Sequence, residues 1–176
     1  MQTIRGVAEC DIEAIAVIYG YHVLRGTASF ETEPPGHTEM MRRYSVLRDQ
    51  AYPYLVAEAD GAVLGYAYAG PYRPRAAYQS TVEDSIYVRA DLTGRGVGTQ
   101  LLGALIAACE RRGYRQMIAV VGDCASVPSI RLHERHGFSR VGTLRSVGYK
   151  NGRWLDSVLL QRALGYSDST PPSTDR

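Results

Sequence analysis

The sequence contains little lysine, few cysteines and almost no net charge. Only one of its 20 basic side chains, Lys150, is a lysine, and 18 acidic residues leave a net charge of +2. A chain this close to neutral is not typical of a dedicated nucleic-acid-binding protein, and a single lysine disfavours Schiff-base chemistry. The three cysteines, Cys10, Cys109 and Cys124, have no C-x-x-C spacing, so we expect neither a disulfide framework nor a metal site.

Long apolar runs are also missing. Arg, Asp, Glu or Gly interrupts every apolar stretch well before the ~20 residues that a membrane-spanning helix needs, and residues 1–5 lack the apolar stretch of a secretory signal. We therefore expect a cytoplasmic protein without a membrane partner. The 176 residues suit one compact domain, which we place at residues 1–164. Residues 165–176, rich in Ser, Thr, Pro and Asp, are predicted to be a disordered tail.

Hydrophobic periodicity and turn residues predict strands that interleave with helices. Steps of three and four between apolar residues predict helices over 11–22, 38–48, 97–113 and 126–136. Alternating or β-branched stretches predict strands over 3–7, 54–59, 63–69, 81–89, 116–121, 138–144 and 154–161. Residues 71–79 are expected to be irregular, and Asp60-Gly61 to form a hairpin turn. This order predicts an α/β protein with a mixed sheet.

A glycine-rich turn lies between the fourth predicted strand and the long helix. Its sequence is Gly94-Arg95-Gly96-Val97-Gly98-Thr99. Glycines permit a positive φ there, and the unpaired N–H groups of the helix start suit a phosphate or pyrophosphate. The dinucleotide fingerprint would need glycine at position 99, and the nucleotide-triphosphate P-loop would need a lysine. An acyl-coenzyme A is the better match, and a merely tight connection is the alternative.

Several motifs in one order resemble the GNAT superfamily of N-acetyltransferases. They are Gly96-x-Gly98 before the long helix and, later, Ser129-x-x-Leu132-His133-Glu134-x-x-Gly137-Phe138. A narrower similarity, to the branch that acetylates phosphinothricin and methionine sulfoximine or sulfone, is carried by 29–34, 68–71, 81–88 and 152–156. The resemblance spans residues 4–164. It implies an acyl-CoA N-acyltransferase fold, with a central, mostly antiparallel sheet flanked by helices.

The resemblance also implies acetyl-CoA as cosubstrate and assigns residues to hold it. The pantetheine arm would lie along Ile86, Tyr87 and Val88, and the Val88 N–H would serve as oxyanion donor. The diphosphate would be held by residues Arg95, Gly96, Val97, Gly98 and Thr99, with Ser126 and Ser129 at the start of the next helix. Two positions depart from the family pattern, because Thr93 replaces a longer Gln or Arg and Ser126 replaces an Asn.

Two residues are candidates for catalysis. The resemblance selects Glu83 as general base for the amine; a plain strand carboxylate is the alternative. The adjacent Asp84 should point to the opposite face of the strand and so have a different role. His133 stands where many relatives carry a tyrosine that protonates the leaving thiolate. An imidazole could shuttle that proton or bind substrate; the alternative is a histidine that merely packs.

Four further residues are expected to bind the amine substrate. Arg73, Arg75 and Tyr78 lie in the irregular segment before Glu83, and guanidinium groups suit a carboxylate. Phe30 would close the other side of the pocket. The implied reaction is direct attack, in a ternary complex, by the α-amine of a small amino acid or toxic analogue. Another small amine, a protein N-terminus and a non-catalytic acyl-CoA-binding module remain alternatives. The resemblance further implies a homodimer, with the last strand or its turn as contact.

Overall fold

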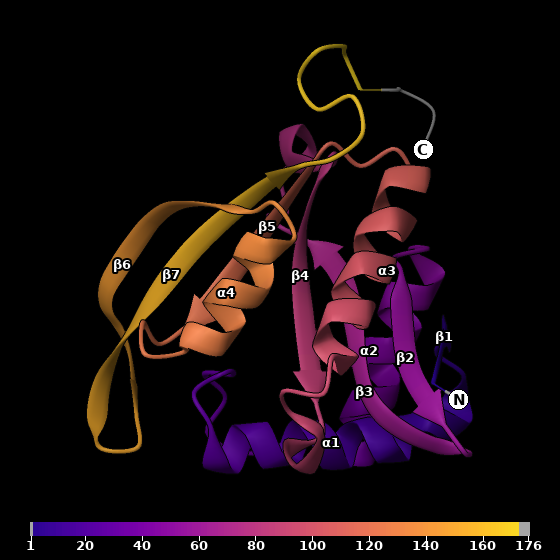
Figure 1. Ribbon diagram of the computed structural model, residues 1–176, viewed down its shortest axis with the longest axis vertical. Helices are drawn as coiled ribbons and strands as arrows, with labels where there is room; N and C mark the ends of the chain where they lie inside the picture. The colour runs from indigo at the N-terminus through magenta and orange to yellow at the C-terminus, as the bar shows by residue number, and fades with distance from the viewer. Residues whose placement is uncertain (1, 173–176) are drawn as a thin grey trace.

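The computed structural model describes residues 2–172 and contains one seven-stranded sheet with helices on both faces (Figure 1). The chain runs β1 (Thr3–Gly6), α1 (Ile12–Arg25), α2 (His37–Asp49), β2 (Tyr54–Ala59), β3 (Ala62–Pro71), β4 (Thr81–Val88), α3 (Val97–Arg111), β5 (Gln116–Gly122), α4 (Val127–Arg135), β6 (Ser139–Lys150) and β7 (Arg153–Ala163). Short 3₁₀ turns lie at Glu9–Asp11, Ala76–Tyr78 and Ala90–Leu92. Over residues 2–172, no helix is long and apolar enough to cross a membrane.

The predicted elements are present, but β6 extends well past its predicted end at residue 144. It continues to Lys150, and the turn to β7 is only Asn151-Gly152, with φ of 52° and 75°. The extension was missed because both faces of most of β6 are exposed, so its side chains lack the alternation that marks a half-buried strand. Its register against β7 also shifts twice, which blurs the periodicity further.

The strand order is β1-β2-β3-β4-β5-β7-β6, and the central pair is exceptional. All neighbouring strands are antiparallel except β4 and β5, which run parallel. These two pair only from Thr81–Asp84 against Gln116–Ala119. Beyond those residues they part, and the second half of β4 has no strand partner on that side. Figure 1 shows β4 upright in the middle of the molecule with β5 leaning away from it.

The sheet separates two apolar cores. One core lies between the sheet and α3 and α4 and contains Val82, Leu101, Leu105 and Ile130. The other lies between the sheet and α1 and α2 and is rich in tyrosine. Because successive strand residues point to opposite faces, β4 presents Val82 and Asp84 to the first core side and Glu83 and Tyr87 to the second.

The predicted tail begins after Leu164. Within its described part, the Arg115 side chain donates to the Ser167 and Pro171 carbonyls and to the Thr170 hydroxyl, at 3.0–3.4 Å. Residues 173–176 lie outside the described part of the chain. The disorder expected for the segment therefore stays a prediction.

Gly65 on β3 provides a test of how closely the central strands approach. A Cβ there would lie 2.8 Å from the Tyr87 carbonyl oxygen and 3.1 Å from Val88 Cα, both of them backbone atoms of β4. Gly65→Ala should therefore lower the free energy of unfolding by about 1–3 kcal/mol, the usual effect of overpacking. Urea denaturation measures this. Gly6→Ala on β1, where nothing lies within 4 Å, is the matched control, and equal midpoints for the two variants would contradict the argument.

Candidate active site

The opening between β4 and β5 exposes main-chain groups of β4. In an antiparallel pair, residues alternate between exchanging two hydrogen bonds and exchanging none. The Arg89 N–H donates to the Leu64 carbonyl at 2.9 Å, so the next pair, Val88 with Gly65, exchanges none. The Val88 N–H and C=O therefore point away from β3 and into the opening. The His22 ring donates from Nε2 to the Val88 oxygen at 2.8 Å. The Val88 N–H points into the opening, where it can donate to a ligand.

The predicted phosphate-binding turn leads from this strand end into α3. Gly94 and Gly96 have φ of +78° and +85°, and a Cβ at either would meet nothing within 4 Å. Both positions are therefore open as well as left-handed, which is the conformation that favours glycine. The α3 helix starts at Val97, whose side chain is buried, so it can offer a ligand only its N–H. The first-turn amides of α3 form a ready anion site, flanked by the exposed Arg95 and Thr99.

The start of α4 forms the other side of the opening, since α4 follows β5 directly. Ser126 is the residue before the helix and Ser129 lies in its first turn; both are half-buried. Thr93, the other departure from the family pattern, donates its hydroxyl to the Ala90 carbonyl at 3.1 Å. The Thr93 hydroxyl proton is therefore used in a hydrogen bond within the turn that contains it. The turn at Gly96 precedes α3 and Ser126 precedes α4, so the two helix starts that are expected to hold the coenzyme follow the ends of β4 and β5.

Glu83 lies on the opposite face of the sheet from this path, half-buried beside the α1 and α2 side. Burial raises the pKa of its carboxyl, the charge of Asp84 raises it further, and the charge of Arg73 lowers it. A carboxylate with a raised pKa is a better proton acceptor near neutral pH than an ordinary one. The structure thus gives Glu83 the property that a general base requires.

Arg73, Arg75 and Tyr78 line one hollow together with Tyr72 and Pro74. Both arginines are exposed, and the Arg73 guanidinium lies 5.1 Å from the centre of the Tyr72 ring. Neither forms an ion pair with a carboxylate in the described part of the chain. Two cations in one hollow, one of which acts on the pKa of Glu83, favour an anionic ligand.

Phe30 lies on the far side of the opening from β4. Its ring contacts the backbone of Gly122 at the end of β5 and of Gly148 on β6, where a larger residue would overlap the ring. The segment that carries Phe30 is held by Lys150, whose buried Nζ donates to the Ser29 carbonyl at 2.6 Å. Phe30 remains 37% exposed, and its expected role in closing the substrate pocket stays a prediction.

His133 is buried on the α3 and α4 face, away from Glu83. Its Nε2 lies 3.0 Å from Asp84 Oδ2 and its Nδ1 lies 2.7 Å from the Ser129 carbonyl. The ring edge packs on Phe138, with centroids 5.1 Å apart. The structure therefore does not bring the two candidate catalytic residues together on one face, and it pairs His133 with the carboxylate next to Glu83.

Residues 18–138 match the family described as the acetyltransferase (GNAT) family. The chain is 53% identical over 170 residues to a phosphinothricin N-acetyltransferase of Alcaligenes faecalis, covering 97% of this chain and 86% of the relative. It is 39% identical over 170 residues to an L-methionine sulfoximine/L-methionine sulfone acetyltransferase of Pseudomonas aeruginosa, covering 96% and 98%. The chain belongs to the GNAT acetyltransferase family.

A solved structure supports the same conclusion. The crystal structure of a GNAT superfamily phosphinothricin acetyltransferase from Sinorhizobium meliloti, in complex with AcCoA, matches with a TM-score of 0.96 at 43% identity. The match covers 99% of this chain and 94% of that one. The resemblance, the fold class and the assignment as an N-acetyltransferase that were expected from the sequence are confirmed.

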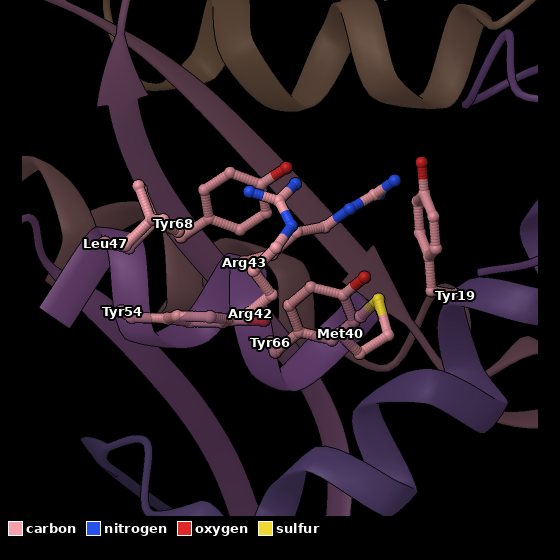
Figure 2. Close-up of a pocket in the computed structure, with 9 residues that line it drawn as sticks. Tyr19, Met40, Arg42, Arg43, Leu47, Tyr54, Tyr66 and Tyr68 are labelled. Carbon is pink, nitrogen blue, oxygen red and sulfur yellow. The ribbon is translucent and has the colours of Figure 1, made fainter. Parts of the chain in front are cut away.

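One feature of this GNAT chain was not predicted: a cavity of about 210 Å³ under α2 (Figure 2). Tyrosines from α1, β2 and β3 surround it, and Met40 and Leu47 of α2 close it. Tyr68 is a diagonal neighbour of Glu83 across the β3–β4 pair, so the cavity borders the candidate base on the same face. The spacing of Tyr66 and Tyr68 by two residues was the available signal, since it places both rings on one side of a strand.

The effect of Arg73 on Glu83 can be tested through the pH profile. Arg73→Gln removes a cation that lowers the pKa of Glu83, so that pKa should rise. The acid limb of kcat/KM, where the base becomes protonated, should move to higher pH. Arg75→Gln is the matched control, because Arg75 does not contribute to the pKa of Glu83. An unmoved limb in Arg73→Gln, or equal movement in both variants, would count against Glu83 as the base.

Proposed function

We propose that the protein transfers the acetyl group of acetyl-CoA to the α-amino group of a small amino acid or of a toxic analogue. Phosphinothricin, methionine sulfoximine and methionine sulfone, which the relatives' names give as their substrates, are the first acceptors to test. The observation that carries the proposal is Glu83, a half-buried carboxylate of raised pKa on which the charge of Arg73 acts. Arg73 and Arg75 line one hollow, and neither forms an ion pair with a carboxylate in the described part of the chain. Polyamines and aminoglycosides, which are cationic, would meet the wrong charge at this hollow.

The coenzyme side of the proposal depends on main-chain donors. Acetyl-CoA supplies an activated thioester and a diphosphate. The amides from Gly96 to Thr99 fit the diphosphate because the turn is open and left-handed. The free main-chain groups of Ile86 and Val88 fit an extended amide-containing arm in the opening, and the Val88 N–H fits a developing oxyanion. Ser126 and Ser129 are proposed to line the same path, and Val97 contributes only its N–H. Tyr87, whose main chain is paired with Tyr66 of β3, only joins the two strand residues whose main-chain groups face the coenzyme.

Glu83 is proposed to accept the proton of the amine. An α-amine has an unperturbed pKa near ~8, so Glu83 needs to accept one proton, directly or through a water. For His133, on the opposite face of β4, donation of a proton to the leaving thiolate stays a prediction from the sequence. Its Nδ1 is held by Ser129, so that role requires Nε2 to leave Asp84.

The base assignment predicts a specific kinetic defect. Glu83→Gln should lower kcat by about 10²–10⁴, the usual contribution of general base catalysis, while the Kd of acetyl-CoA stays unchanged. Release of free CoA thiol measures turnover, and calorimetry measures binding. Glu13→Gln, an exposed residue on α1, is the control. Unchanged turnover in Glu83→Gln would remove Glu83 from the mechanism.

The carboxylate assignment predicts a change in specificity. Arg75→Ala should raise the KM for an acceptor with a free α-carboxylate and have less effect on the KM of its carboxamide, because the guanidinium has no charge partner on the amide. The thiol-release assay with matched acid and amide acceptors makes the comparison. An equal loss for both acceptors would refute the assignment. A panel of the three named analogues and common amino acids in the wild type then ranks the substrates.

Assembly as a homodimer and a cytoplasmic location belong to the same proposal. All three cysteines, which lie in the described part of the chain, are free thiols, as a reducing compartment allows. The β6–β7 hairpin is an edge of the sheet, and it carries several exposed large apolar side chains of the kind that a partner can cover. These side chains are Val141, Leu144, Val147, Tyr149 and Trp154.

A substitution on the hairpin tests the dimer. Trp154 is 64% exposed and packs edge-on against Tyr149, so a carboxylate at 154 would place a charge in the contact. Trp154→Glu should halve the molar mass in light scattering from about twice to once 19.4 kDa. Val17→Glu, at an equally exposed position on α1, is the control and should leave the mass unchanged. A wild type that is already monomeric at micromolar concentration would contradict the proposal.

A further inference from the structure

A buried pair of side chains joins α4 to β4 on the coenzyme face of the sheet. The His133 and Asp84 side chains are only 5% and 2% exposed, and they meet through Nε2 and Oδ2 at 3.0 Å. The other ring nitrogen, Nδ1, lies 2.7 Å from the Ser129 carbonyl oxygen, one turn back in the same helix. The residues are 49 positions apart in the chain, so the contact is a product of the fold.

The hydrogen bonds determine how many protons the pair holds. A carbonyl oxygen only accepts, so the bond to Ser129 requires a proton on Nδ1 of His133. The bond to Asp84 requires a second proton, between Nε2 and Oδ2. Imidazole is more basic than a carboxylate, with unperturbed pKa values of ~6.5 and ~3.9, so that proton belongs to the ring. His133 is then an imidazolium and Asp84 a carboxylate.

The surroundings agree with this charge state. Burial of the ring lowers the pKa of His133, but the hydrogen bond and the charge of Asp84 outweigh burial and leave that pKa raised. The second carboxylate oxygen, Asp84 Oδ1, is buried without a hydrogen-bond partner among residues 2–172. A buried carboxylate needs a cation in contact, and His133 is its ion-pair partner. Two titratable groups near the pair, Glu83 and Cys109, have their pKa raised by the charge of Asp84. The other charged side chains of α4 and α3 are Arg131, Glu134, Arg135, Glu110 and Arg111.

The position of Asp84 gives the pair a role. Asp84 is the last residue of β4 that is paired with β5, opposite Ala119, so the opening begins directly after it. Helix α4, which carries His133, follows β5 and supplies Ser126 and Ser129 to the other side of that opening. The pair therefore connects the two sides of the opening at its closed end.

We propose that Asp84 is a positioning residue that holds His133 as an imidazolium, and that this ion pair fixes α4 against β4 at the width that the coenzyme arm requires. The inference rests on the proposed function, in that the opening is taken as the acetyl-CoA site. In this arrangement the Nε2 proton is committed to Asp84 rather than to the reaction. The pair acts on coenzyme binding more than on the chemical step.

The pH dependence follows from the raised pKa of His133. The ion pair is complete at low pH, below the ordinary pKa of imidazole, and is lost as pH rises through the raised pKa of the folded state. Affinity for CoA should therefore fall on the alkaline side in the wild type. In Asp84→Asn the charge partner is gone and His133 becomes a neutral ring. The affinity for CoA should then be several-fold lower, and it should no longer fall on the alkaline side.

Nitrogen NMR of the histidine rings tests the charge state directly in the wild-type protein. Both nitrogens of His133 should show imidazolium shifts at pH 7, and Asp84→Asn should convert them to a neutral pattern with the proton on Nδ1. His37, an exposed ring at the start of α2 that has no carboxylate partner in the described part of the chain, is the internal reference. A neutral His133 ring in the wild type at pH 7 would overturn the proposal, even if no variant folds.

Calorimetry with free CoA tests the positioning role without turnover. Asp84→Asn and His133→Gln should each raise the Kd of CoA several-fold, and the double variant should be no worse than either single one. Asp49→Asn, which alters an exposed ion pair with Arg48 on α2, is the control for loss of a carboxylate. Normal CoA affinity with a collapsed kcat in His133→Gln would favour His133 as proton donor and refute the positioning role. No CoA binding by the wild type would instead refute the proposed function.

Discussion

The separation of β4 from β5 is the constraint on which the rest of the site depends. The sheet leaves main-chain groups of Ile86 and Val88 without a neighbouring strand, in the middle of the molecule rather than at an edge. Buried peptide groups need partners, and His22 meets only the Val88 oxygen. An extended ligand with amide groups of its own satisfies the remainder. The same parting places the start of α3 and the start of α4 on either side of one opening, so charge and backbone donors converge there.

Alternation along β4 divides the chemistry between two faces. Glu83 and Asp84 are consecutive carboxylates, yet one faces the tyrosine-rich side with Arg73 near it and the other is buried against His133. They remain coupled through charge, since ionised Asp84 raises the pKa of Glu83. An ion pair that keeps Asp84 ionised therefore also keeps Glu83 a stronger base. The proposed structural role of Asp84 and the proposed catalytic role of Glu83 are in this way linked across a single peptide bond.

Local signals predicted most of this arrangement, and long-range contacts supplied the rest. Asp60-Gly61, the glycines at 94 and 96, and the apolar steps along α3 each specify their own conformation, so the elements and the turn were predictable. The opposite orientation of Glu83 and Asp84 follows from strand geometry alone. In contrast, the partner of His133 lies 49 residues away, and nothing in the sequence near either residue indicates the contact. The extended β6 was missed because a strand exposed on both faces carries no periodic signal.

Lys150, the single lysine, joins the segment of Phe30, which is proposed to border the substrate pocket, to the hairpin that is proposed to form the dimer. Burial lowers the pKa of Lys150, and Glu31 opposes this; the ammonium donates to the Ser29 carbonyl. A compact ammonium can satisfy one buried carbonyl where a guanidinium, with five donors, would leave several unmet. The bond fixes the segment that carries Phe30 to the end of β6, and Trp154 stands beside that end on β7. A partner that covers Trp154 would therefore also steady Phe30, so that assembly and acceptor binding would act through one element.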